Sequence, residues 1–125
     1  MSLYNIRIIN VGRNIYRGSI MVDSNQSIYG ICTEANYDSK RILVGSLKNE
    51  GIYIEIICQE SGTTYPILAK KTDLFPQKSI AKSTYFYGQS LDNFNDWWDI
   101  EITNVKDIEN KLKTEANKKL QLIKK

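Results

Sequence analysis

One segment of the 125-residue sequence alternates more regularly than the rest: Ile52-Tyr53-Ile54-Glu55-Ile56-Ile57-Cys58-Gln59. Its even-numbered residues are all apolar, whereas its odd-numbered residues mix polar and apolar side chains. A period of two is that of a β-strand with one dry and one mixed face. The segment therefore predicts a half-buried strand of an antiparallel sheet.

Further short runs of β-branched and aromatic residues lie on both sides of this segment, separated by polar turn signals. Sequential strands joined by tight connections usually pair, and closing such a meander removes its exposed edges. We therefore predict a mainly β fold, an eight-stranded antiparallel up-and-down meander that forms a small barrel or a strongly curved sheet. A two-sheet sandwich is the alternative. The predicted strands are 3–11, 15–22, 28–33, 41–47, 52–59, 65–71, 79–87 and 97–103, with a loop at 88–96.

The last segment, 104–125, changes to helical spacing. Asn104 is a candidate N-cap, and the segment holds seven lysines against three acidic residues. We predict a C-terminal amphipathic α-helix whose apolar face docks on the strands or on a second subunit, which leaves open a homodimer through the helix. The chain is then one domain, 1–125, with a β-meander at 3–103 and a helix at 104–125. The apolar face comprises Val105, Ile108, Leu112, Ala116, Leu120 and Ile123.

The composition excludes several kinds of active site. The chain has no histidine and only two cysteines. Three kinds of site are therefore excluded: catalytic triads with an imidazole base, metal sites with imidazole ligands, and zinc sites with thiolate ligands. The glycines are isolated and form no phosphate-binding loop. We therefore expect no catalytic residue, no metal and no cofactor. An enzyme that uses carboxylates and tyrosines is an alternative, although Asp99 and Glu101 are expected on a solvated outer face.

Aromatic residues gather on both sides of the predicted 88–96 loop. Tryptophan and tyrosine dominate binding hot spots, so this set could anchor a partner or line a ligand cavity. The alternative is that its members pack in the core or cover the outside of the sheet. Trp97 is the strongest single candidate, because alternation places it opposite a buried Trp98. The candidate binding residues are Tyr85, Tyr87, Phe94, Trp97 and Trp98.

Glycine and strand spacing in the first half of the chain resemble the hairpins of calycin-type (lipocalin-like) barrels. Among these, the chain is most similar to the lipocalin-like regulators of bacterial type III secretion, and the resemblance implies a calycin-like barrel that binds a partner protein. The early Gly-x-Trp of lipocalins is missing, and no acidic surface run like that of the regulators occurs, so their partner contacts are not transferred. The resemblance lies in Gly18-Ser19-Ile20-Met21-Val22, Ile28-Tyr29-Gly30, Val44-Gly45-Ser46-Leu47 and Gly51-Ile52-Tyr53-Ile54.

These observations favour a non-enzymatic protein-binding module, a small regulator or inhibitor. The alternative is a barrel that binds or sequesters a small apolar or nucleotide-like ligand. We do not expect nucleic-acid binding, because the lysine-rich tail has no arginine or aromatic residue. No stretch approaches the ~18 apolar residues of a membrane span, and no signal peptide is evident, so we expect a cytoplasmic protein with Cys32 and Cys58 as free thiols.

Overall fold

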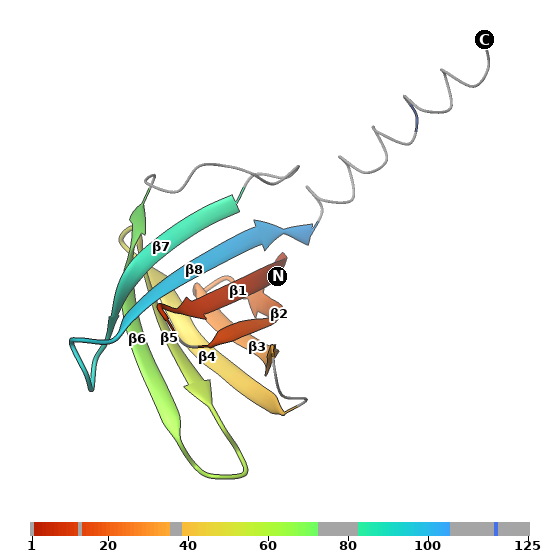
Figure 1. Cartoon of the computed structure of the whole chain (residues 1–125). Coiled ribbons are helices and arrows are strands. Elements are labelled where there is room, and N and C mark those ends of the chain that lie inside the picture. The colour runs from red at the N-terminus through yellow and green to blue at the C-terminus, as the bar shows by residue number, and fades with distance from the viewer. Residues whose placement is uncertain (1, 13, 36–38, 73–82, 106–116, 118–125) are drawn as a thin grey trace.

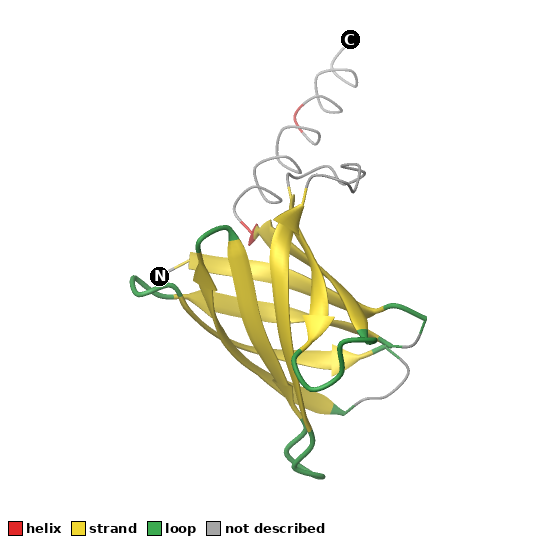
Figure 2. Cartoon of the chain, turned by 90° about the vertical axis from the view of Figure 1, so that its left-hand side faces the viewer, coloured by secondary structure: helices red, strands yellow, loops and turns green. Residues whose placement is uncertain are grey.

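The strands of the chain form a closed antiparallel β-barrel, in which each strand pairs with the next and the last pairs with the first (Figure 1). The computed structural model describes residues 2–12, 14–35, 39–72, 83–105 and 117. Figure 2 shows the strands wrapping around a common axis. The strands are β1 (Ser2–Asn10), β2 (Ile15–Val22), β3 (Ser27–Glu34), β4 (Lys40–Lys48), β5 (Gly51–Ile57), β6 (Thr64–Thr72), β7 (Ser83–Ser90) and β8 (Trp97–Asn104).

Closure depends on the pairing of β1 with β8. Their register runs from Tyr4 opposite Asn104 to Asn10 opposite Trp98. Asn10 adds a side-chain hydrogen bond across this seam, from its amide to the Trp97 carbonyl oxygen at 3.2 Å. Because every strand has two neighbours, the barrel presents no unpaired edge. The predicted up-and-down barrel is confirmed, and neither the open curved sheet nor the two-sheet sandwich is formed.

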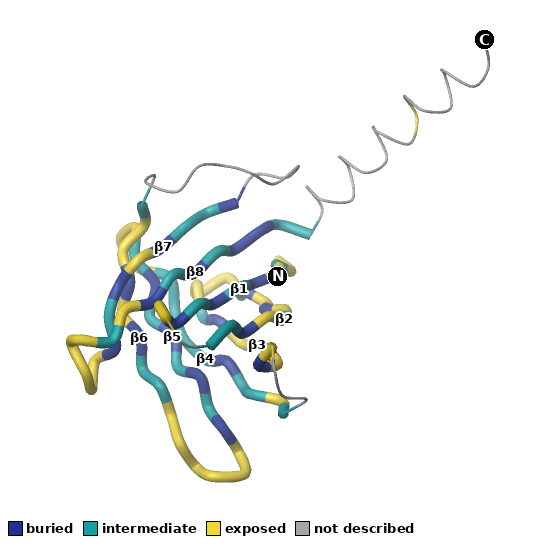
Figure 3. Tube along the Cα trace, viewed as in Figure 1, coloured by how far each residue is buried: buried dark blue, intermediate teal, exposed yellow. Residues whose placement is uncertain are grey.

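The interior is filled by inward-pointing side chains from all eight strands. Burial alternates along much of the sheet, most regularly in β5, and the buried side chains form one continuous core; β4 contributes only Leu43 as a fully buried residue (Figure 3). Trp98 and Tyr16 are the largest of its fully buried side chains. Gly18 also faces inward, and a Cβ there would lie 2.0 Å from the Ile31 carbonyl oxygen. Glycine at this position therefore lets β3 approach β2 closely where the sheet curls.

The β7–β8 hairpin differs from its prediction. The prediction ended the seventh strand at residue 87, whereas β7 continues to Ser90; residues 79–82 lie outside the described residues. Gly88, predicted in a loop, is a strand residue opposite Ala69 and Trp98. A Cβ on Gly88 would lie 2.0 Å from the Leu68 carbonyl oxygen, so glycine is needed for strand packing rather than for a turn. The connection shortens to residues 91–96.

The predicted C-terminal helix cannot be compared with the structure in full. Asn104, its predicted N-cap, is the last residue of β8 and pairs with Tyr4 of β1. Residues 106–116 and 118–125 lie outside the described residues. The helix, and a homodimer formed through it, therefore stay predictions.

Candidate functional site

Three of the predicted aromatic residues lie on the outer surface of the β7–β8 hairpin. The rings of Tyr87 and Trp97 stack with their centroids 5.0 Å apart and their planes inclined by 14°. Trp97 is 40% exposed, and Phe94, in the connection between the strands, is 67% exposed. The Gln89 amide fixes this connection by donating to the Phe94 carbonyl oxygen at 2.8 Å. We call five exposed residues the aromatic patch: Tyr87, Phe94, Trp97, Leu68 and Leu91.

The other two predicted residues are placed differently. Trp98 is 2% exposed and lies inside the barrel, where its indole nitrogen donates to Ser90 Oγ at 2.7 Å. It therefore supports the hairpin from within, and Trp97 lies opposite a buried Trp98 as predicted. Tyr85 is half-buried on the outer wall and donates a hydrogen bond to Glu101, which raises the pKa of the phenol. A phenol held protonated in this way is a poor general base.

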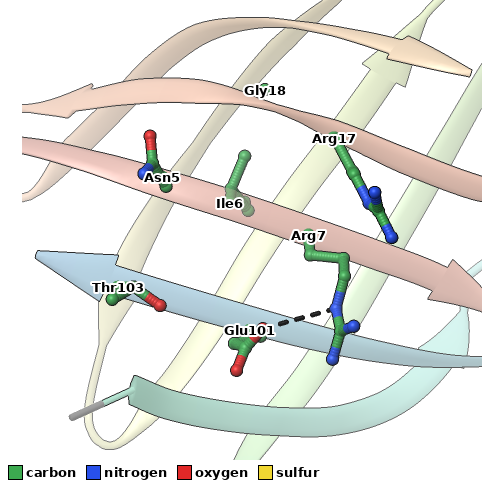
Figure 4. A pocket seen from close by; sticks show the side chains of 7 residues that line it. All are labelled: Asn5, Ile6, Arg7, Arg17, Gly18, Glu101 and Thr103. Carbon is green, nitrogen blue, oxygen red and sulfur yellow. Dashed lines mark ion pairs between the residues drawn. The ribbon is translucent and has the colours of Figure 1, made fainter. Parts of the chain in front are cut away.

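A pocket of about 330 Å³ opens on the outer wall where β2, β1 and β8 lie side by side (Figure 4). Arg7 occupies its centre, opposite Arg17 on one neighbouring strand and Glu101 on the other. Arg7 Nε lies 3.3 Å from Glu101 Oε1, yet it makes no well-directed hydrogen bond. The pocket is lined by Asn5, Ile6, Arg7, Arg17, Gly18, Glu101 and Thr103.

A carboxylate with an unsatisfied oxygen lies between this pocket and the aromatic patch. Asp99 pairs with Tyr87 across the hairpin and with Ile9 of β1. Its Oδ1 is buried without a hydrogen-bond partner among the described residues. Burial raises the pKa of Asp99, against the opposing effect of Arg7. The wall thus combines aromatic, acidic and cationic groups across the neighbouring strands β7, β8, β1 and β2.

A second apolar surface was not predicted. Met21 and Tyr29 are opposite each other on β2 and β3, and Leu3 of β1 extends the row. These three side chains and Ile31 are 46–57% exposed. The signal that could have revealed them is the run from Ile28 to Cys32, which is apolar at both alternating positions and therefore leaves apolar side chains on the outside. We call Leu3, Met21, Tyr29 and Ile31 the sheet patch.

One mouth of the barrel holds a buried ion pair. Arg41 Nη2 lies 3.4 Å from Glu34 Oε2, and both side chains are at most 13% exposed. Cys32 pairs with Arg41, and the register of β4 with β5 places Cys58 on its other side. With a strand between them the two cysteines are free thiols, as expected. Burial raises the pKa of Cys32 to about 12, so this thiol stays protonated.

The described part of the chain contains neither a candidate metal cluster nor a helix that could span a membrane. Within those residues no group of three or more Cys, Asp or Glu side chains could hold a metal ion. No helix among them is long and apolar enough to cross a membrane.

Comparison of the chain with protein-family models, with curated proteins and with solved structures finds no match in any of the three. The class of protein is defined by the fold, an eight-stranded closed antiparallel barrel that is compatible with the calycin-like architecture. What the barrel does has to be argued from the residues of its wall.

Proposed function

We propose that this protein is a non-enzymatic protein-binding module that docks its partner on the aromatic patch. The observation that carries the proposal is the Tyr87–Trp97 stack, a pair of rings held against each other while both stay more than a third exposed. Monomeric proteins rarely leave large apolar side chains together on their surface unless the surface binds something. The family resemblance adds the narrower proposal of a small cytoplasmic regulator or inhibitor.

The structure of the patch suits a protein partner. Tyrosine and tryptophan have few rotatable bonds, so a stacked pair loses little conformational entropy when a partner covers it. Trp98 and Ser90 fix the strands beneath the patch through their hydrogen bond. Phe94 lies in the connection that follows β7 and is 67% exposed, so its ring is accessible to a partner. The patch is thus a preorganised anchor rather than a collapsed cluster.

The two alternatives have less support. A small-molecule carrier needs room inside the barrel, and the interior is occupied by large side chains such as Trp98 and Tyr16. An enzyme built on carboxylates and tyrosines needs an activated group. Hydrogen bonding to Glu101 raises the pKa of Tyr85, and hydrogen bonding to Glu55 raises the pKa of Tyr53 to about 12, so neither tyrosine supplies a phenolate at neutral pH. Burial raises the pKa of Asp99, a shift that suits a general acid and is the observation that favours the enzyme alternative.

Affinity capture from the native host with matched variants tests the proposal. F94S/W97S removes two exposed rings from the aromatic patch, and Y29T/I31T removes comparable apolar area from the sheet patch. We expect the wild type and Y29T/I31T to recover the same partner, and F94S/W97S to lose it. Capture of that partner by all three proteins, or loss with Y29T/I31T alone, would contradict the proposed surface. Native mass spectrometry that finds a bound small ligand and no protein would support the carrier instead.

A further inference from the structure

We infer that the pocket between β1, β2 and β8 binds a single carboxylate from an acidic segment of the partner, held by the guanidinium groups of Arg7 and Arg17. The inference rests on the proposed function, because it names the chemistry of the segment that reaches past the aromatic patch. It goes beyond that function by assigning a ligand group to a pocket that the aromatic patch does not include.

The donors of the pocket are largely uncommitted. Arg17 is exposed and makes no ion pair or hydrogen bond with any described residue. Arg7 forms an ion pair with Glu101 through Nε, and no hydrogen bond from its two terminal nitrogens occurs within the described ranges. Figure 4 shows both side chains extending toward the same end of the pocket. A planar carboxylate matches the fork of a guanidinium group, so the pair can hold one carboxylate with several charge-assisted hydrogen bonds.

The register itself favours an anion here. Arg7 and Arg17 are directly opposite each other on adjacent strands. Like charges in that position repel and destabilise the pair of strands. An anion bound between the two guanidinium groups replaces this repulsion with two attractions. The barrel therefore gains stability when the pocket is filled.

Charge balance selects the kind of anion. The residues that line the pocket include two arginines and one glutamate, a charge of +1, and Asp99 outside the lining adds a negative charge near Arg7. A carboxylate neutralises the positive charge of the lining. A phosphate dianion would leave an excess negative charge beside Glu101, whose side chain is only 18% exposed and is therefore poorly screened by water. The geometry thus points to aspartate, glutamate or a chain-terminal carboxylate.

The distance along β8 connects the pocket to the aromatic patch. Trp97 and Glu101 are four residues apart on the same strand and both lie on the outer wall. At the rise of a β-strand this is a separation of about 13 Å. An extended segment of the partner covers that distance in four residues. We therefore expect an apolar residue of the partner on the patch and an acidic residue four positions away.

The pocket can be tested without the natural partner. The probe is N-acetylglutamate N-methylamide, which carries one side-chain carboxylate, and the uncharged glutamine analogue is the control ligand. Binding is followed by ¹H–¹⁵N chemical shifts. We expect saturable shifts at Asn5, Arg7 and Arg17 with the glutamate probe only. R17Q should weaken binding about tenfold or more, because a hydrogen bond to a charged group is lost. The matched control K48Q, which removes an exposed cation of β4, should leave binding unchanged.

Each outcome decides the inference. Equal shifts with both ligands, binding that survives R17Q, or shifts spread over surface lysines would overturn it. Tighter binding of inorganic phosphate than of the probe would overturn the assignment to a carboxylate. Peptides with leucine four residues from glutamate should bind more tightly than peptides with the two adjacent, and equal affinity would break the link between pocket and patch. If the probe binds while host capture finds no partner, the proposed function fails and the pocket stands.

Discussion

Trp97 and Trp98 are adjacent in sequence, yet the structure gives them opposite roles, and substitution separates these roles. Trp98 is 2% exposed, and a tryptophan-to-alanine change in a core costs about 3–5 kcal/mol. The lost hydrogen bond also leaves Ser90, which is 1% exposed, without its donor and adds about 1 kcal/mol. W98A should therefore lower the free energy of unfolding by about 4–6 kcal/mol. W97A loses mainly the stack on Tyr87 and should cost about 1–2 kcal/mol.

Urea unfolding followed by far-ultraviolet circular dichroism measures both values. With a slope of about 1.5 kcal/mol per molar urea, the midpoint should fall by roughly 3 M for W98A and by about 1 M for W97A. If W98A does not fold, W98F keeps a ring, removes the indole donor and should cost about 2 kcal/mol. The effect on partner binding should be the opposite of the effect on stability: W97A should lose the partner, and W98F should retain it. Equal destabilisation by W97A and W98A would refute the division between an inner and an outer tryptophan.

Three further predictions concern the wall and the mouth of the barrel. G18A should destabilise the fold by about 3 kcal/mol, because its Cβ would clash with the Ile31 carbonyl oxygen. G62A meets no atom, and only the left-handed φ of +72° costs it about 1 kcal/mol, so a loss at Gly18 no larger than that of G62A would show that close approach at Gly18 is not needed. The raised pKa of Asp99 means that the folded state binds this proton more tightly than the unfolded chain, so Asp99 costs stability as the pH rises above about 4. D99N should therefore gain stability over the wild type as the pH rises above about 4 in urea titrations, and a gap that does not widen with pH would contradict this. Hydrogen bonds from Ser61 lower the pKa of Cys58, whereas burial raises the pKa of Cys32 to about 12. Iodoacetamide should therefore alkylate Cys58 before Cys32, and S61A should slow the alkylation of Cys58. Faster labelling of Cys32, located by peptide mass spectrometry, would refute the assignment.

Local sequence signals were sufficient for the strands and for their order. The alternation of Ile52, Ile54 and Ile56 reflects a strand with one face in the core, and all three residues are buried. Polar turn signals separated the strands because a two- to five-residue connection is all that an antiparallel neighbour needs. Seven of the eight predicted strands agree with the observed ones to within two residues at each end. The predicted meander therefore follows from periodicity together with the turn signals between the strands.

Closure and the outer wall were not accessible in this way. The contact between Asn10 and Trp97 joins residues 87 positions apart, and no local pattern specifies that pairing. From the sequence, Gly88 cannot be distinguished from a glycine in a turn. In the barrel it is a strand residue whose missing side chain lets β6 approach β7 closely. The pocket is a third case, since Arg7 and Arg17 meet through the β1–β2 hairpin but Glu101 reaches them only when the barrel closes. Non-local register, rather than composition, creates this part of the site.

Site-specific photo-crosslinking at position 94 tests the central proposal most directly. Replacing Phe94 with benzoylphenylalanine keeps an aromatic ring at the most exposed position of the aromatic patch, and the same residue at Glu60, exposed beyond β5, is the control. We predict that irradiation in the native host joins one protein to position 94 and none to position 60, and that W97S removes the crosslink. No crosslink at position 94, or the same products from both positions, would contradict a partner surface on the aromatic patch.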